Sequence, residues 1–577
     1  MRITKVLTLV LAIVMALGCF FGCTPATTEE GSNEVAKVDW TAYDKLIADI
    51  KAETNLIERE KLMHEAEDML METGAIVPLY FYNDIYLMKP SVQGFYATVY
   101  GTKYFMYATN GDKDTLKINL ASEPDKLDPA LNSSVDGACL VANSFAGLCT
   151  YDANGAVVND LAADCVQSKD GLIWTITMKD DLKWSNGDVL NAKDFEYSWK
   201  RAAATETAAD YGYMFAGIKG YPDALDVTAS EDGKTLTVNL AAPCPYFKDL
   251  LAFPTFFPVH KASVEGAKGY KDENGDILNP GAWATEDGFV SNGAFILKDW
   301  THNESMTYEK NPNYHNAADV KLSKLEFMLS ADDTAIYNAY NDGSIDFADT
   351  VPTAQVSKLL NNEEFYIVDN LGTYYVAFNI KSDMFAGFTA EEAAKYRQAL
   401  GLLIDRQQIV DNVGQTGQQP ANTFIPAKML DGQGGEFKAN DDAYTFPDKN
   451  SVGYFDPAAT KEAYAANVAK AKELLTEIGF KFGDDGLLSA ETPIAFEYLT
   501  NDGSAHVAIA EIMKENFYAL GIEMTIREIE WNTFLNDRKN GNYDVARNGW
   551  LADFNDPINM LEMWTSDSGN NDCQFGK

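Results

Sequence analysis

The chain has 577 residues, a formal net charge of −40 and 46% hydrophobic residues. This length exceeds what one hydrophobic core supports, so two or three domains are expected. The negative charge excludes a general nucleic-acid-binding protein, because phosphate groups would be repelled. Aromatic residues make up 12% of the chain. Most of them are expected in cores, and a minority could line a binding cleft.

The N-terminus has the pattern of an export signal. Arg2 and Lys5 precede an apolar run over 6–17 that is too short to cross a bilayer comfortably. We therefore predict a signal peptide over residues 1–22. Nothing later in the sequence is long and apolar enough to span a membrane, so the rest of the chain is expected to be soluble and tethered.

Two cysteines follow this apolar run. The sequences ALGC and FFGC end at Cys19 and Cys23 and resemble the lipobox of bacterial lipoproteins, in which the cysteine is acylated. Small residues favour Cys19, whereas the polar stretch after Cys23 favours the second site. Either choice predicts a polar tether over 24–38 and a protein held by its lipid at the extracellular face of the cell membrane.

The next elements alternate in character along the chain. Residues 41–53 and 58–74 have apolar residues at helical spacing, and Gly74 is expected to end the second helix. An apolar, β-rich run follows over 75–89. Short alternating strands are predicted next, then a loop-rich region over 244–330. The strands are TLKINLA (115–121), LIWTITMK (172–179) and KTLTVNLA (234–241).

From about residue 391 helices and strands alternate, which indicates an α/β lobe. Three segments have the helical pattern and two have the strand pattern. The helices are expected over 391–406, 463–479 and 505–521, and the strands over 493–500 and 523–530.

Motifs of catalysis are absent from the sequence. It contains no phosphate-binding loop, nucleophile elbow or dinucleotide fingerprint. His64 begins an HEAED sequence without the second histidine of a zinc protease, and we predict it to be a surface residue. The stretch starting at Asp272 lacks the glycine and glutamate of a calcium loop. We therefore expect no enzyme, no cofactor and no metal, although a paired-carboxylate hydrolase remains possible.

Five further cysteines fit no zinc-binding spacing. Their odd number leaves at least one unpaired in a monomer, and the sequence does not determine which of them pair. They are Cys139, Cys149, Cys165, Cys244 and Cys573.

One acid stands out in the sequence NGWLADFNDP (548–557). Asp553 lies among aromatic residues, and the nearest basic residue, Arg547, is six positions away. A carboxylate in such surroundings is costly unless a cation or several donors accompany it. Either the turn leaves Asp553 in water, or the cation comes from outside the chain. The ammonium group of a ligand would supply that charge.

Several blocks together resemble the OppA-type oligopeptide-binding proteins, the family 5 extracellular solute-binding proteins of ABC importers. This resemblance implies an α/β fold with two lobes, of the periplasmic-binding-protein type II, cluster C, with a hinge and an extra small domain. The blocks are YDVARNGWLADFNDP (543–557), LDPALNSS (127–134), LKWSNGDVLNAKDFEYSWKR (182–201), VSNGAFILKDW (290–300), KNPNYHNA (310–317) and YRQALGLLIDRQQIV (396–410).

The order of these blocks departs from the family in one respect. A segment that looks like the family's C-terminal region stands at residues 43–96, which implies a circular permutant with the family's ends joined near 107–114 and new ends between Lys577 and Asp39. The alternative is a truncated gene fused to a fragment of a neighbour. Permutation predicts that 40–109 packs into the lobes with both new ends adjacent, because domain ends are often close together.

The resemblance also implies a division of the chain. Lobe I would hold 110–148 and 271–371, lobe II, the small extra domain, 149–270, and lobe III 372–577. The permuted segment 39–109 would add 39–82 to lobe III and 83–109 to lobe I.

Roles in binding follow from the resemblance by position. Asp553 would pair with the α-ammonium of a peptide, Arg547 would meet the carboxylate of a short peptide, and Arg538 is a weaker candidate nearby. A bound peptide would lie extended between two backbone segments, as in β-augmentation. These segments are Ser133, Ser134 and Val135, and Asn548, Gly549, Trp550 and Leu551.

Aromatic residues would surround the side-chain pockets. Core packing is the competing interpretation for each ring, as a structural ion pair is for Arg547 and a solvated turn acid or helix cap is for Asp553. The aromatic candidates are Trp531, Tyr211, Tyr374, Tyr375, Tyr80 and Tyr82.

The implied mechanism is capture of an oligopeptide by closure of two lobes, followed by docking of the monomer on the transmembrane permease of an ABC importer. The same architecture could serve another solute, such as a dipeptide, a cell-wall peptide or a metal chelate. A secreted carboxylate-dependent hydrolase is the rival from another class.

Overall fold

The computed structural model describes residues 34–120, 122–439 and 460–577. The predicted signal peptide, both candidate lipidation cysteines and most of the tether lie outside these residues. Within the described ranges, no helix is both long and apolar enough to cross a membrane.

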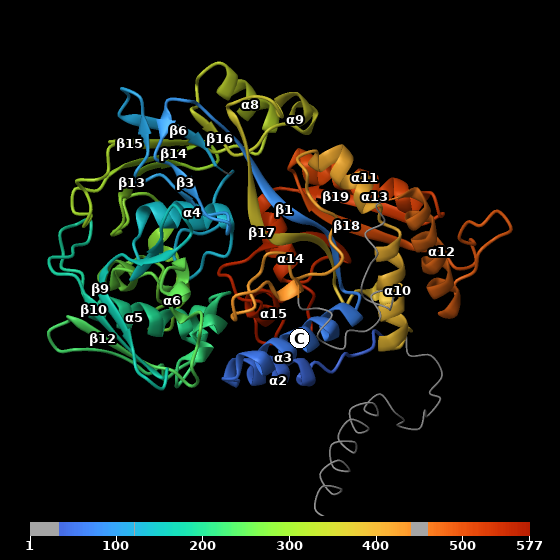
Figure 1. Ribbon diagram of the computed structural model, residues 1–577, viewed down its shortest axis with the longest axis horizontal. Helices are drawn as coiled ribbons and strands as arrows, with labels where there is room; N and C mark the ends of the chain where they lie inside the picture. Colours follow the sequence, from blue (N-terminus) through green and yellow to red (C-terminus); the bar gives the residue numbers. More distant parts are fainter. Residues whose placement is uncertain (1–33, 121, 440–459) are drawn as a thin grey trace, which may run out of the picture.

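A ten-stranded mixed sheet runs through the molecule (Figure 1). Its two halves are joined by the long antiparallel pair β1 and β17, whose register shifts between Phe81 and Asn83, at the predicted boundary of two lobes. In order across the sheet, the strands are β13 (Phe295–Thr301), β14 (Ser305–Lys310), β15 (Lys324–Met328), β6 (Thr115–Asn119), β16 (Phe347–Ala348), β1 (Ile76–Met88), β17 (Phe365–Phe378), β20 (Val545–Leu551), β18 (Ala495–Asn501) and β19 (Glu523–Ile529).

The N-terminal segment is part of this architecture and not a detached domain. Helices α2 (Thr41–Ala52) and α3 (Leu56–Glu72) pack on α15 (Ile558–Glu562), and β1 then enters the centre of the sheet. Gly74 follows α3 at a φ of +63°, which explains why a glycine ends this helix. The predicted helices and the β-rich run of this segment are therefore confirmed.

The two ends of the described chain meet in space. The ring of Trp40 stacks on that of Phe575 with centroids 4.2 Å apart, and its indole nitrogen donates to the carbonyl of Trp564 over 2.8 Å. The Tyr43 hydroxyl donates to the carbonyl of Leu561 over 2.9 Å. Figure 1 shows the C-terminus beside α2 and α3. This is the packing expected if the segment 40–109 completes the lobe that holds the C-terminus.

A smaller unit stands apart from the central sheet, within residues 149–270 (Figure 1). Its four-stranded sheet has the order β11 (Val227–Ala229), β12 (Thr235–Asn239), β10 (Ile173–Met178) and β9 (Ala162–Gln167). Helix α5 (Ala192–Ala203) packs on β11 and β12 through its apolar side. Strands β7 (Cys149–Tyr151) and β8 (Val157–Asn159) form a separate antiparallel pair in the same unit. Strand β10 alternates exposed and buried residues, as its sequence predicts.

The helices that cover the rest of the central sheet agree well with the expected α/β alternation. The capping box of Thr389 and Glu392 starts α10, because each residue satisfies a free amide of the other at the helix N-terminus. The helices are α4 (Val135–Ser144), α8 (Asp333–Asn341), α9 (Thr353–Leu359), α10 (Ala390–Leu402), α11 (Arg406–Ile409), α12 (Lys461–Glu477), α13 (Ser504–Tyr518) and α14 (Trp531–Lys539).

Two expectations are wrong. His64 is 2% exposed and not a surface residue, since its ring stacks on Phe437 with centroids 3.8 Å apart. Burial lowers the pKa of His64 to about 3. The region 244–330 is loop-rich only in its first part, because it also contains β13, β14 and β15. Residues 302–304 join β13 to β14, and the longer segment 311–323, which contains three Asn and one Pro, joins β14 to β15. This composition obscured the strand pattern.

Candidate functional site

A cavity of about 550 Å³ lies where the two halves of the central sheet and the smaller unit meet. This volume falls within the range of small-ligand sites. Thirteen of the sixteen residues predicted from the sequence line it. They are Tyr80, Tyr82, Ser133, Ser134, Val135, Tyr211, Trp531, Arg538, Arg547, Gly549, Trp550, Leu551 and Asp553.

Three predicted residues lie away from the cavity surface. Tyr375 is fully buried against Phe424 and Trp564, so its role is core packing. Tyr374 is also fully buried, and its hydroxyl contacts the ring nitrogen of His506 over 3.2 Å. Asn548 is buried, with its amide donating to Asp572 over 2.9 Å. Tyr374 and Asn548 therefore support the wall from behind.

The wall formed by Arg547, Gly549, Trp550, Leu551 and Asp553, here called the Asp553 wall, is built on β20 and the turn that follows it. Strand β20 pairs with β17 along its whole length, but with β18 only at Val545 and Ala546. Beyond Ala546, no strand in the described ranges pairs with that edge. The backbone beyond Ala546 thus borders the cavity as a strand edge of the kind that accepts an added strand, and the Gly549 amide on it donates to the side-chain oxygen of Asn548 over 2.8 Å.

Asp553 is half-buried and is held by neutral groups. The hydroxyl of Tyr211 donates to one of its oxygens over 3.2 Å, and the amide of Asn559 to the other over 2.8 Å. No lysine or arginine of the described chain forms an ion pair with it. Burial raises the pKa of Asp553 to about 7, although both hydrogen bonds act in the opposite direction. The carboxylate can therefore gain from a cation that enters the cavity.

The hydrogen bond from Tyr211 also has a structural meaning, because it connects the smaller unit to the Asp553 wall. A second link joins the smaller unit to the end of α14, since Lys539 pairs with Asp210. The hydroxyl of Ser133 donates to Asp210 over 2.9 Å. These contacts close the cavity on the side of the smaller unit. Ser134 caps α4, and Val135 is its first residue, so the predicted flanking segment is a loop and a helix start instead of a strand.

Arg547 is 9% exposed and lies among aromatic rings. Its guanidinium carbon is 5.5 Å from the ring centroid of Tyr374 and 5.6 Å from that of Trp531. Within the described ranges no carboxylate pairs with it, and its Nε has no hydrogen-bond partner. Cation–π contacts offset only part of the cost of burying this charge. The interpretation of Arg547 as a structural ion-pair residue therefore has no support in this part of the chain.

Arg538 differs in this respect. Its Nε lies 2.8 Å from Asp572, and both side chains are largely buried. The charge of Arg538 is thus neutralised within the fold, which fits a structural role at the cavity wall better than direct binding of an anion.

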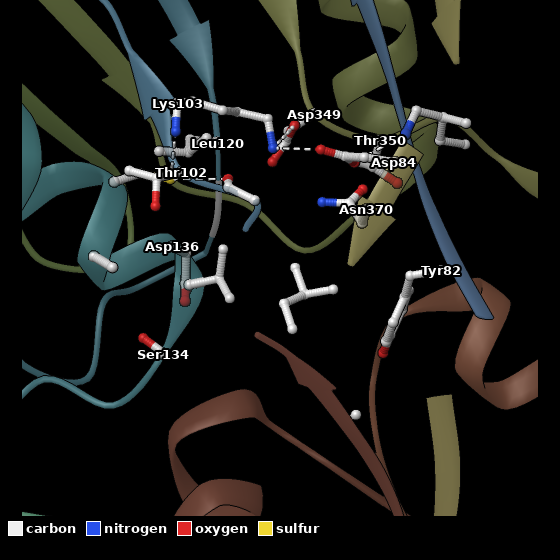
Figure 2. A pocket seen from close by; sticks show the side chains of 18 of the residues that line it. Tyr82, Asp84, Thr102, Lys103, Leu120, Ser134, Asp136, Asp349, Thr350 and Asn370 are labelled. Carbon is white, nitrogen blue, oxygen red and sulfur yellow. Dashed lines mark hydrogen bonds and ion pairs between the residues drawn. The ribbon is translucent and has the colours of Figure 1, made fainter. Parts of the chain in front are cut away.

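A second wall carries charges that the sequence analysis missed. Lys103 is 4% exposed and lies 2.7 Å from Asp84 and 3.0 Å from Asp349 (Figure 2). We call these three residues the Lys103 wall. Asp136, at the start of α4, faces the same cavity, and burial raises its pKa. Burial, together with the neighbouring charge of Asp84, raises the pKa of Asp349 to about 8, although Lys103 opposes this.

Only one member of this wall had a signal in the sequence. Asp84 lies within the apolar run of β1, as Asp553 lies within an aromatic turn. Lys103 and Asp349 come from distant segments and show no local pattern. No group of three or more His, Cys, Asp and Glu side chains in the described chain is placed to hold a metal ion.

Comparisons with known proteins agree with this architecture. Residues 156–572 match the family described as bacterial extracellular solute-binding proteins, family 5. The chain belongs to this family. The family 5 protein is 33% identical over 480 residues to the oligopeptide-binding protein OppA of Bacillus subtilis, which covers 80% of this chain and 79% of that protein. It is 31% identical over 481 residues to the murein peptide-binding protein MppA of Escherichia coli, with 80% of each chain covered.

Solved structures show the same fold. The crystal structure of Haemophilus influenzae OppA in complex with the peptide RPPGFSPFR matches with a TM-score of 0.68 and 27% identity, over 80% of this chain and 85% of that chain. The predicted α/β binding-protein fold is thereby confirmed. Members of this family bind solutes, and substrate binding for an ABC importer is the role that the relatives support for this chain.

Proposed function

We propose that this protein captures oligopeptides outside the cell and delivers them to an ABC permease. The observation that carries the proposal is Asp553, a half-buried carboxylate without a cation of the described chain, next to the free edge of β20. A peptide supplies both missing partners, because its α-ammonium meets the carboxylate and its backbone meets the strand edge. Relatives named for oligopeptide binding support this choice of ligand.

Arg547 completes the proposed site. A buried guanidinium without a carboxylate partner can donate charge-assisted hydrogen bonds to the free carboxylate of a short peptide. The cavity would then bind the two ends and the backbone of the peptide. The aromatic residues and the Lys103 wall would surround the side chains of the peptide.

The first test compares the protein with its Asp553→Asn variant. We expect affinity for peptides with a free N-terminus to fall by roughly 10- to 100-fold, since a hydrogen bond to a charged group contributes about 1.5–3 kcal/mol. N-acetylated peptides should lose little. Isothermal titration calorimetry with matched free and acetylated peptides measures both.

The matched control is Asp249→Asn. Asp249 is also half-buried, with a pKa raised to about 6 by burial, but it does not line the cavity. Equal loss for free and acetylated peptides in Asp553→Asn would contradict the proposed role. Mass spectrometry of the peptides after incubation distinguishes a receptor, which returns them intact, from a carboxylate-dependent hydrolase, which returns fragments.

The lipid anchor is a separate part of the proposal. We infer that Cys19 or Cys23 is acylated and that the monomer remains at the extracellular face of the membrane. Mass spectrometry of the mature N-terminus identifies the acylated cysteine. Substitution of that cysteine by serine should move the protein from the membrane fraction to the medium or the soluble fraction.

We also propose that the chain is a circular permutant of its family. The stacking of Trp40 on Phe575 and the central place of β1 support this. Moving residues 39–109 behind Lys577 with a short Gly-Ser linker, so that the chain starts at residue 110, should leave peptide affinity unchanged within about twofold, because such linkers are flexible and surface ends tolerate reopening. A folded but inactive product would contradict the proposal.

A further inference from the structure

Two cysteine side chains lie side by side in the smaller unit. Cys149 stands on β7, and Cys165 stands on β9. Strand β7 pairs with β8, and the amides of Leu161 and Ala162 then donate to the carbonyls of Gly147 and Leu148, so β9 starts beside β7. The two thiols lie within hydrogen-bonding range of each other.

The other three cysteines in the described ranges have different surroundings. The Cys139 thiol contacts the carbonyl of Gly101 over 3.6 Å, and the Cys573 thiol contacts that of Ala75 over 3.7 Å. Cys244 is half-buried near Arg59 and Tyr246. The sequence did not determine which cysteines could form a disulfide. In the structure, Cys149 and Cys165 are the candidate pair among the described cysteines.

The two neighbouring thiols differ in access and acidity. Cys165 is half-buried, and the hydrogen bond from Cys149 lowers its pKa. Cys149 is buried, and the same hydrogen bond, together with burial, raises its pKa. Lys248 favours the thiolate form of both. Because an external disulfide reaches a half-buried thiol more readily than a buried one, Cys165 is the attacking group, and Cys149 is the group that reacts second.

We propose that Cys149 and Cys165 form a redox-responsive dithiol–disulfide pair that ties β7 to β9. In the first step the Cys165 thiolate attacks one sulfur of an external disulfide, such as oxidised glutathione, and a thiolate leaves. In the second step Cys149 loses its proton and attacks the Cys165 sulfur, and the second thiolate leaves. Two protein thiols are thus oxidised, and one external disulfide is reduced to two thiols.

The location of the pair gives the bond a consequence. Tyr211, which holds Asp553, belongs to the same smaller unit as both cysteines. A disulfide here closes a short loop of the unfolded chain and stabilises the unit that covers one side of the cavity. An extracellular protein meets oxidising conditions, in which such bonds persist. The inference stands independently of which ligand the cavity binds.

The full chain is incubated with defined ratios of reduced and oxidised glutathione and digested without reduction. Mass spectrometry should find one cross-linked product that joins the peptide of Cys149 to that of Cys165, and the thermal unfolding midpoint should rise by ~5 °C. Addition of a reducing agent should reverse both changes.

Single variants separate the two roles. Cys149→Ser should accumulate a stable mixed disulfide of glutathione at Cys165, whereas Cys165→Ser should react at least about tenfold more slowly. Cys244→Ser is the control. Cys244 is also half-buried, but the residues that influence the pKa of its thiol include Arg59, Asp556 and Tyr246 and no other cysteine. Its cross-linking should equal that of the unchanged protein. A protein that stays fully reduced in oxidised glutathione, or that links other cysteines, overturns the proposal.

Discussion

The two charged walls of the cavity differ in whether their charged side chains are paired within the fold. In the Lys103 wall, one buried ammonium lies between two carboxylates of the chain. In the Asp553 wall, a carboxylate and a guanidinium line the same cavity without an opposite charge from the described residues. The first wall is complete without a ligand. Under the function proposed above, a ligand with a cationic and an anionic end would complete the second wall.

This difference predicts that the charges of one wall contribute to the stability of the fold and those of the other to ligand binding. Charges paired within the fold mainly cost free energy when one partner is removed, because the other is left buried. Charges left unpaired cost free energy in the empty protein and return it on binding. Removal of a charge should therefore destabilise the protein in the Lys103 wall and weaken binding in the Asp553 wall.

The largest expected effect is that of Lys103→Met. This change leaves Asp84 and Asp349 without their shared cation, and breaking a buried pair typically costs about 3–5 kcal/mol. Urea unfolding of the ligand-free protein measures the loss. Lys481→Met is the matched control, since Lys481 pairs with Glu491 over 2.7 Å and both side chains are exposed, at 63% and 70%. Its effect should stay within about 1 kcal/mol. Similar losses for both variants would remove the distinction.

The next effect is that of Arg547→Met. We expect about 30-fold weaker binding of short peptides with a free carboxyl group, equivalent to ~2 kcal/mol, and little change for C-amidated peptides. The empty variant should be at least as stable as the unchanged protein, because an unpaired buried charge is removed. Calorimetry and urea unfolding measure the two quantities.

Arg538→Met gives the contrast within the same wall region. It leaves Asp572 buried without its cation, so the free energy of unfolding should fall. If Arg547→Met destabilised the protein as much as Arg538→Met does, Arg547 would have a partner in the fold and the contrast between the two walls would fail.

Much of the fold and part of the site could be predicted from the sequence. Periodicity identified α2, α3, β1 and the alternation after residue 391, because these elements carry continuous patterns. Asp553 could be found because an acid among aromatic residues is itself a signal. By contrast, Lys103 and Asp349 are 246 positions apart, and no local pattern connects them. The burial of His64 depends on Phe437, which lies 373 positions away in the sequence.

Resemblance to a family predicted which residues lie near the cavity, but it did not predict which of their side chains are exposed to it. Tyr374 and Tyr375 are neighbours in β17 and point to opposite sides of the strand, as successive residues must. Tyr374 lies behind the cavity wall next to Arg547, while Tyr375 lies in the core against Trp564. The packing of other elements decides which ring meets a ligand, and the sequence does not contain that information locally.

The smallest effect is a pH dependence that reports on the Asp553 wall. Burial raises the pKa of Asp553 from 3.8 to about 7 in the folded, empty protein. The protonated form is therefore favoured by folding, and the stability that it contributes is present at acidic pH and lost as the pH rises from about 4 to 7. A peptide ammonium needs the ionised form, so binding should release a proton and tighten as the pH rises.

Between pH 6 and pH 7 the ionised fraction of a group with a pKa of 7 rises about fivefold, and the affinity should rise by the same factor. The peptide's own amino group, with a pKa of about 7.7–8, stays mostly charged in this interval. Asp349, whose pKa is raised to about 8, titrates in the same region and could affect any ligand. N-acetylated peptides distinguish the two acids, since they retain a contribution from Asp349 and lose that from Asp553. Calorimetry in buffers of different ionisation enthalpy counts the released protons. A fivefold change that persists with acetylated peptides, or in Asp553→Asn, would assign the titration to the Lys103 wall instead.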